Sequence, residues 1–291
     1  MKNTTIQQFF KKFPSDEACL EHIMKTRYGL ESKCPKCEKK TKFHRVKSQR
    51  AYVCQWCGWH TYPCVDTPFE SSRTSLQLWF YAIYLFSTTR SGVSAKELQR
   101  QLGVTYKCAW RMGHEIRKYM AEVDGDNKLD DIVEVDETYI GGKKEGKRGR
   151  GADGKSIVFG MMEKDGDIMT KIVDDVKAKT LQPIIESNVE KGSEIQSDEL
   201  RSYKSLNKKG FKHKTVNHGQ KEYVAKDGTT VNSLEGFWSR LKLSIKGTHI
   251  HVSKKHLAKY ASEFEYRFNS RSCPEAMFEE LLNSFEKPSL K

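Results

Sequence analysis

Two pairs of closely spaced cysteines constrain the fold of this chain more than any other feature. Each pair has the form CxxC, and 16 residues lie between Cys37 and Cys54. Thioredoxin-like redox chemistry needs only one such pair, and a reducing cytosol disfavours two disulfides. The spacing instead predicts a zinc ribbon, in which one structural Zn²⁺ supplies much of the folding energy. Its predicted ligands are Cys34, Cys37, Cys54 and Cys57, with His44, His60 and Cys64 as nearby alternatives.

A second feature is the stretch VEVDETYIGG at residues 133–142. It alternates apolar and polar residues and ends in a glycine pair, so it predicts a strand that runs into a turn. Asp136 lies in the middle of this strand, where a carboxylate is costly to bury unless a cation meets it. Taken alone, the pattern leaves Asp136 open as a salt-bridge partner or a metal ligand.

Two later segments favour the metal ligand. A short strand ends near Asp198, and residues 231–242 predict a helix. The residues on one face of that helix follow spacings of three and four: Asn232, Glu235, Ser239 and Lys242. Carboxylates of Asp136, Asp198 and Glu235 brought together would repel one another unless divalent ions neutralise them. Oxygen ligands suit Mg²⁺ or Mn²⁺, and two such ions about 4 Å apart support phosphoryl transfer.

With these residues in place, the chain resembles the DDE transposases of bacterial insertion sequences. The resemblance is to the group with an N-terminal zinc ribbon and an RNase H-like, integrase-type catalytic domain. It covers nearly the whole chain and is carried by VEVDETYIGGK, SDELRSYKSL, VNSLEGFWSRLK, IKGTHIHVSKKHL and EFEYRFNSR. It implies a transposase that cuts DNA at the element ends and transfers the strands into target DNA.

The resemblance also assigns the catalytic residues. It implies two Mg²⁺ or Mn²⁺ ions held by Asp136, Asp198 and Glu235, with Lys242 reaching toward a phosphate. Asn232 is the rival third ligand; Glu235 follows Asp198 after 36 intervening residues, and a carboxylate holds Mg²⁺ better than an amide. Asn232 would then lie next to the metal ligands without binding the metal itself. Among neighbouring acids the resemblance selects Asp136 over Glu134 and Glu137, and Asp198 over Glu194 and Glu199.

The order of expected elements fits a multidomain α+β protein. Strands near 156–163 and 167–173, a helix near 180–188 and a fifth strand near 213–217 give an RNase H-like α/β domain with a mixed five-stranded sheet. The expected parts are a helical lead-in (1–30), the zinc ribbon (31–68), a helix-turn-helix DNA-binding domain (69–123), the catalytic domain (128–272), and a C-terminal helix and tail (273–291).

The helix-turn-helix is expected after a first helix at about 76–87. Ser94 begins the next helix, Gly103 makes the turn and Thr105 begins the third helix. Any small helical bundle fits this pattern; the words GVSAKELQRQLGV and AWRM favour DNA binding by resemblance, although Cys108 stands where the family usually has Thr. Predicted core residues of the third helix are Ala109, Trp110, Met112, Ile116 and Tyr119, and predicted outward residues are Lys107, Arg111, Arg117 and Lys118.

Charge indicates the partner. The chain has 51 Lys and Arg against 38 Asp and Glu, a net charge of +13, which favours a polyanion such as nucleic acid over charge kept for solubility alone. We expect double-stranded DNA, both terminal inverted repeats and target, bound by a homodimer or larger assembly. The predicted DNA contacts are Lys107, Arg111, Arg240, Lys242 and a basic loop with Lys143, Lys144, Lys147, Arg148 and Arg150.

The sequence also predicts the compartment and leaves two other functions open. It has no apolar run of about 18 residues and begins without the apolar core of a signal peptide, so we expect a cytoplasmic, nucleoid-associated bacterial protein. One alternative is a DNA-binding regulator with an inactive catalytic domain. The other is an RNase H-like nuclease that cuts without joining.

Overall fold

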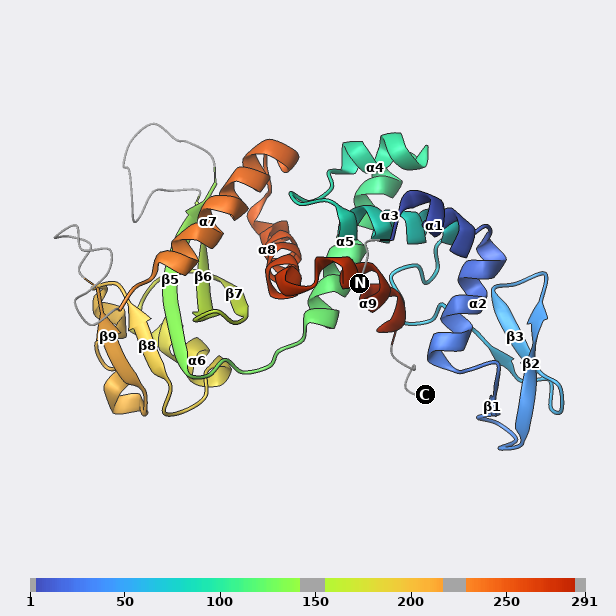
Figure 1. The fold of residues 1–291 in the computed structure, drawn as a ribbon, viewed down its shortest axis with the longest axis horizontal. Helices are drawn as coiled ribbons and strands as arrows, with labels where there is room; N and C mark the ends of the chain where they lie inside the picture. The colour runs from blue at the N-terminus through green and yellow to red at the C-terminus, as the bar shows by residue number, and fades with distance from the viewer. Residues whose placement is uncertain (1–3, 142–154, 217–228, 286–291) are drawn as a thin grey trace. The chain divides into compact units, whose positions relative to one another are not determined.

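The structure is a computed structural model that describes residues 4–141, 155–216 and 229–285 (Figure 1). The chain divides into two compact units, of which the first is Met1–Tyr119 with Ser272–Lys291 and the second is Met120–Arg271. None of the helices in these described ranges is long and apolar enough to cross a membrane.

The first unit combines a small antiparallel sheet with helices. The sheet has the strand order β1-β2-β3-β4, from β1 (Glu31–Lys33), β2 (Lys40–Val46), β3 (Ala51–Cys54) and β4 (His60–Thr61). The helices are α1 (Ile6–Lys12), α2 (Asp16–Arg27), α3 (Leu76–Thr88), α4 (Ala95–Leu102), α5 (Tyr106–Asp124), a 3-10 turn (Pro274–Ala276) and α9 (Met277–Asn283). α5 extends a few residues into the second unit.

The helices α4 and α5 follow the predicted pattern closely. Ser94 Oγ accepts a hydrogen bond from the Glu97 amide and begins α4. Gly103 ends α4 in the left-handed region at φ 65°, which favours glycine. Thr105 Oγ1 accepts from the Cys108 amide in the first turn of α5. The structure thus contains two helices joined by a three-residue turn.

Two expectations for α5 are wrong. Trp110 is 37% exposed and stacks on His114 at 3.9 Å between ring centroids, so it does not belong to the core stripe. Arg117 is only 2% exposed, because its guanidinium donates to the Val93 carbonyl oxygen at 2.9 Å and lies over the Phe86 ring. A helical period predicts which residues share a face, but such specific partners decide whether an arginine can be buried.

The second unit is built on a mixed five-stranded sheet with the order β7-β6-β5-β8-β9. The strands are β5 (Ile132–Ile140), β6 (Ser156–Glu163), β7 (Ile168–Val173), β8 (Glu194–Ser197) and β9 (Lys212–Thr215). β5 pairs antiparallel with β6 and parallel with β8, which pairs parallel with β9. This is the RNase H-like order that the sequence predicted.

Helices cover both faces of this sheet. They are α6 (Ala178–Asn188), α7 (Asn232–Ser244) and α8 (Lys254–Asn269), with short helical turns at Arg201–Tyr203, Leu206–Lys209, Ile245–His249 and Ser270–Ser272. Alternate residues of β5 point to opposite faces. Val133 and Val135 pack with Leu181 of α6, whereas Ile140 lies in the other core with α7 and α8. α7 lies over β5 and β6 (Figure 1).

Candidate active site

Two predicted acids lie side by side where the short strand β8 ends next to β5. The register pairs Val135 of β5 with Ser197, the last residue of β8; Asp136 follows Val135 in the middle of β5, and Asp198 follows Ser197 directly after the end of β8. The charge of Asp198 contributes to the raised pKa of Asp136, so the two carboxylates interact. The structure therefore brings together the first two acids that the sequence selected.

The Asp136 carboxylate is costly to ionise. Burial, then the charge of Glu137, and then that of Asp198 raise its pKa to about 7. One oxygen, Oδ2, accepts a hydrogen bond of 3.0 Å from the Trp238 indole Nε1. A divalent cation beside Asp136 and Asp198 would offset the repulsion between the two carboxylates and lower this pKa.

Neighbouring acids on β5 have other partners. Glu134 is 1% exposed and its two oxygens accept from Ser233 Oγ at 3.0 Å and from the Leu234 amide at 3.1 Å. Glu137 points to the opposite face of the sheet and accepts from the Tyr203 hydroxyl at 3.0 Å. Each carboxylate is thus stabilised by a different element.

Glu134 and Asp136 together align α7 with β5. Two residues along a strand span about 6.6 Å, and the four residues from Leu234 to Trp238 span about 6 Å along a helix. The two hydrogen-bonded contacts therefore match in spacing and fix both the position and the rotation of α7. This role of Glu134 could not be predicted from the sequence, because helical spacing does not show which strand residue contacts which turn of a helix.

The third predicted acid lies on α7. Glu235 is in the first turn of this helix and is exposed, as is Asn232. Lys242 lies two turns further on; partial burial lowers its pKa, and the charge of Asp136 opposes that shift, so the two groups interact. The assignment of Glu235 rather than Asn232 as a metal ligand stays a prediction, as does the role of Lys242.

Among the described residues, one group of at least three Cys, His, Asp or Glu side chains has its ligand atoms within 4.8 Å of one another. It consists of Cys34, Cys37, Cys54 and Cys57. The carboxylates of Asp136, Asp198 and Glu235 do not all approach this closely.

The cysteine cluster has the dimensions of a zinc site. Sulfur atoms are 3.6 Å apart for Cys34 and Cys57 and 3.9 Å apart for Cys37 and Cys54. A tetrahedral ion with bonds of about 2.3 Å holds its sulfurs about 3.8 Å apart, whereas a disulfide needs about 2.05 Å. His44 and His60 are exposed and lie outside the cluster, as does the buried Cys64. The structure thus brings the four predicted cysteines together in an arrangement that suits one zinc ion.

The predicted DNA-contacting residues are divided between the units. Lys107 and Arg111 are exposed on α5, and Arg111 donates to Ser72 Oγ at 3.0 Å. Arg240 and Lys242 are exposed on α7. The basic loop residues 143–150 lie outside the described residues.

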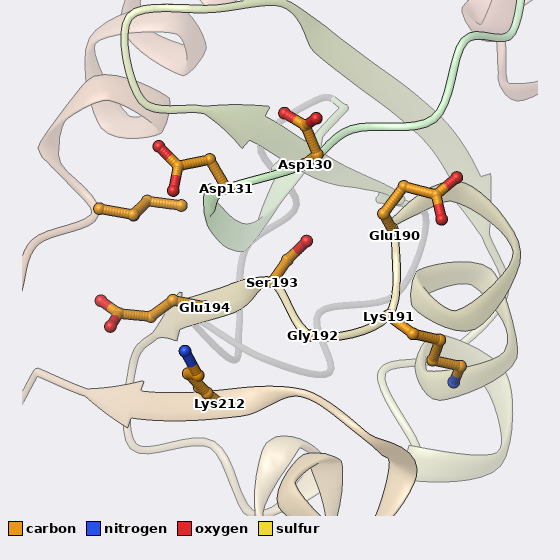
Figure 2. Close-up of a pocket in the computed structure, with 9 residues that line it drawn as sticks. Asp130, Asp131, Glu190, Lys191, Gly192, Ser193, Glu194 and Lys212 are labelled. Atoms are coloured by element: carbon orange, nitrogen blue, oxygen red, sulfur yellow. The ribbon is translucent and has the colours of Figure 1, made fainter.

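A separate cavity of about 420 Å³ lies at the amino-terminal ends of β5 and β8 (Figure 2). Figure 2 shows acidic side chains of Asp130, Asp131, Glu190 and Glu194 around it, with Lys191 and Lys212. Two of these acids are already paired, Glu194 with Lys214 at 3.0 Å and Glu190 with Lys128 at 3.7 Å. It is distinct from the Asp136 site.

Comparison with known proteins identifies the family. Residues 128–269 match the ISXO2-like transposase domain, and residues 14–60 match the transposase zinc-ribbon domain. An uncharacterized transposase-like protein of Haemophilus influenzae is 31% identical over 103 residues, which cover 35% of this chain and 81% of that protein. The chain belongs to the ISXO2-like transposases. The predicted membership of the zinc-ribbon insertion-sequence transposases is thereby confirmed.

Other similarities are more distant. An uncharacterized protein in transposable element ISH50 of Halobacterium salinarum is 25% identical to this ISXO2-like transposase over 279 residues, covering 88% of this chain and 92% of that protein. Crystal structures of the Mos1 strand transfer complex and of a pre-cleavage Mos1 transpososome are each 13% identical, with TM-scores of 0.31 and 0.26. The first comparison covers 69% of this chain and 74% of the other, and the second covers 70% and 77%.

Proposed function

We propose that this ISXO2-like transposase cuts DNA at the ends of its insertion element and joins the exposed 3′-OH groups to target DNA. The observation that carries the proposal is that Asp136, in the middle of β5, lies next to Asp198, directly after the end of the parallel strand β8. Their interaction, together with burial and the charge of Glu137, raises the pKa of Asp136 to about 7. Such an arrangement is stabilised when a cation is bound.

The chemistry of these side chains suits Mg²⁺ or Mn²⁺. Carboxylate oxygens are preferred ligands of both ions, and we assign Asp136, Asp198 and Glu235 to hold two of them. Divalent ions bound there supply activation of an attacking oxygen and stabilisation of a leaving oxygen. Glu235 is on α7, the helix whose Trp238 contacts Asp136, and its exposed side chain is accessible to a ligand.

The remaining residues position the DNA. The ammonium group of Lys242 interacts with Asp136 and would neutralise a phosphate next to the acids. Arg240, two residues before Lys242 on the same helix, is also exposed. We assign the zinc ribbon and the α4–α5 helix pair to the terminal repeats; because two element ends must be joined, we assign a dimer or larger assembly to the active complex.

Strand transfer in vitro tests the proposal. The assay combines purified protein, labelled DNA with the element's own ends, a supercoiled target and Mg²⁺ or Mn²⁺. We expect joined products from the wild type and none from Asp136→Ala or Asp198→Ala. Glu235→Gln and Asn232→Ala distinguish the two candidate third ligands, because only loss of the true ligand abolishes joining.

The outcomes separate the alternatives. Cleavage without joining would identify a nuclease. Tight binding of the element ends without chemistry in either metal would identify a DNA-binding regulator. Joining by Asp136→Ala would contradict the assignment of the first metal ligand.

A further inference from the structure

The contact between Asp136 and Trp238 depends on the strand next to β5. In the antiparallel register of β5 and β6, the residue directly opposite Asp136 is Gly160. A Cβ atom at Gly160 would lie 2.6 Å from Trp238 Cζ2, 2.7 Å from its Cη2 and 3.0 Å from Leu234 Cδ2. Since heavy atoms do not approach this closely, the absence of a side chain at Gly160 makes room for the indole ring.

The indole ring is held firmly in this space. Trp238 is 3% exposed and packs edge-on against the Phe237 ring at 5.3 Å between centroids. One helical turn earlier, Glu134 accepts hydrogen bonds from Ser233 and Leu234 and fixes the start of α7. A tryptophan side chain has two rotatable angles, and both are constrained when the ring is packed against the sheet.

The single polar atom of this ring is aimed at the acid. A buried indole N–H needs an acceptor, and Nε1 of Trp238 donates to Asp136 Oδ2 at 3.0 Å. A hydrogen bond to a carboxylate from a rigid donor restricts the rotation of that carboxylate. An apolar ring would fill this space equally well. Packing therefore does not explain why the ring carries an N–H that is directed at Asp136.

We propose that Trp238 is a positioning residue for Asp136. Its indole N–H holds Oδ2 and so keeps the carboxylate in one orientation, with the other oxygen left to bind a divalent cation. Gly160 provides the space that this arrangement requires. The inference rests on the proposed function in one respect, namely that Asp136 is a metal ligand.

The sharpest test removes the N–H and keeps the ring. Trp238 is replaced in the full-length, zinc-loaded protein by benzothienylalanine, in which sulfur takes the place of the indole N–H. Mn²⁺ binding is measured from the electron paramagnetic resonance signal of the free ion, with thermal unfolding in parallel. We expect Mn²⁺ affinity to fall about tenfold or more, as for other groups that orient metal ligands, while the unfolding midpoint changes little.

Two further variants and one kinetic readout complete the test. Phe237→Leu alters packing beside Trp238 without removing the hydrogen bond, and should leave Mn²⁺ affinity unchanged. Gly160→Ala should weaken Mn²⁺ binding because it displaces the indole. In strand transfer, the benzothienylalanine protein should need about tenfold more Mg²⁺ for half-maximal rate, with a smaller change at saturating Mg²⁺.

The outcomes distinguish this inference from the proposed function. Unchanged Mn²⁺ affinity in the benzothienylalanine protein, with binding lost in Asp136→Ala, would overturn the role of Trp238 and leave the metal site intact. Equal losses in that protein and in Phe237→Leu would show that Trp238 acts through packing, which also overturns it. Absence of Mn²⁺ binding in the wild type, or unchanged binding in Asp136→Ala, would overturn both proposals.

Discussion

Three acids on one strand show how position, rather than residue type, assigns a role. Glu134 and Asp136 lie on the α7 face of β5, and Glu137 lies on the opposite face. Each carboxylate accepts a hydrogen bond from a different donor: Glu134 from the Leu234 amide in the first turn of α7, Asp136 from the Trp238 indole, and Glu137 from the Tyr203 hydroxyl. Asp136 is the member of this set that adjoins a further acid, Asp198, which directly follows the neighbouring strand β8. That combination of neighbour and location makes it the candidate metal ligand.

We expect Glu134 to stabilise the fold without binding metal itself. Glu134→Ala leaves the Ser233 hydroxyl and the Leu234 amide without their acceptor at the start of α7. We expect the free energy of unfolding to fall by about 1–3 kcal/mol, measured by urea denaturation. Ser233→Ala removes only one of the two hydrogen bonds and should cost less. Equal stability of Glu134→Ala and the wild type would contradict this role.

Glu265 on α8 predicts a pH effect. Burial raises its pKa to about 7, although its Oε2 accepts hydrogen bonds from the Thr170 amide and hydroxyl. The Glu265 carboxyl ionises at a lower pH in the unfolded chain than in the folded protein. Its ionisation therefore destabilises the fold as pH rises from about 4.5 through 7. We expect Glu265→Gln to match the wild type near pH 4, below the pKa of the unfolded chain, and to exceed its free energy of unfolding at pH 8 by on the order of 2 kcal/mol.

The measurement is the difference between Glu265→Gln and the wild type in urea denaturation, without divalent metals, at several pH values. The contribution of Asp136, whose pKa is also about 7, is common to both proteins and cancels in that difference. The exposed Glu280→Gln serves as the control. A difference that stays constant across the pH range would contradict the expectation.

At this scale the sequence predicted residues whose chemistry is visible in their spacing. The cysteine cluster follows from the spacing of its two CxxC pairs, whereas Asp136 and Asp198 are selected among the neighbouring acids by the family resemblance. The partners of Glu134 and Trp238 could not be predicted, because they depend on how α7 is rotated over the sheet. Buried Arg117 was also missed, since only the three-dimensional structure brings the Val93 carbonyl to it.

Among secondary-structure elements, the strands were the most predictable. Alternation and turn residues predicted a strand at 156–163, which is the extent of β6. The packing of α9 could not be read from any local pattern: His22 lies 3.1 Å from the Leu282 carbonyl oxygen, 260 residues later in the chain. Such contacts follow from the complementarity of distant apolar surfaces, which periodicity does not encode.

The zinc ribbon predicts a local dependence on metal. Cys54→Ser removes one of four ligands, so strands β1 to β4 should lose hydrogen-exchange protection by at least about tenfold, while β5 and β6 in the other unit should keep theirs. Cys273→Ser, outside the cluster, should retain zinc and protection. Chelation of zinc from the wild type should reproduce the effect of Cys54→Ser. Protection of the ribbon strands that survives chelation would contradict a metal-dependent fold.

For the molecule as a whole, the effect of the net charge of +13 on DNA binding depends on where the unpaired cations lie. Some cations are already paired with acids, such as Lys209 with Glu186 at 2.8 Å and Lys214 with Glu194 at 3.0 Å. Paired cations contribute less to the attraction of DNA, because the neighbouring carboxylates cancel their field. The basic loop at 143–150 has five cations and one acid, and we expect it to contact phosphates.

Salt dependence of DNA binding tests location against total charge. One variant replaces the loop cations Lys143, Lys144, Lys147, Arg148 and Arg150 by Gln, and the other replaces Lys191, Lys208, Lys209, Lys212 and Lys214; both lower the net charge from +13 to +8. Each phosphate contact contributes about 0.9 to the slope of log affinity against log salt concentration. We therefore expect the slope to fall by up to about 4.5 in the loop variant and by much less in the other, measured by fluorescence anisotropy on duplex DNA. Equal slopes in the two variants would mean that this transposase binds DNA through its total charge, and that the loop holds no phosphates.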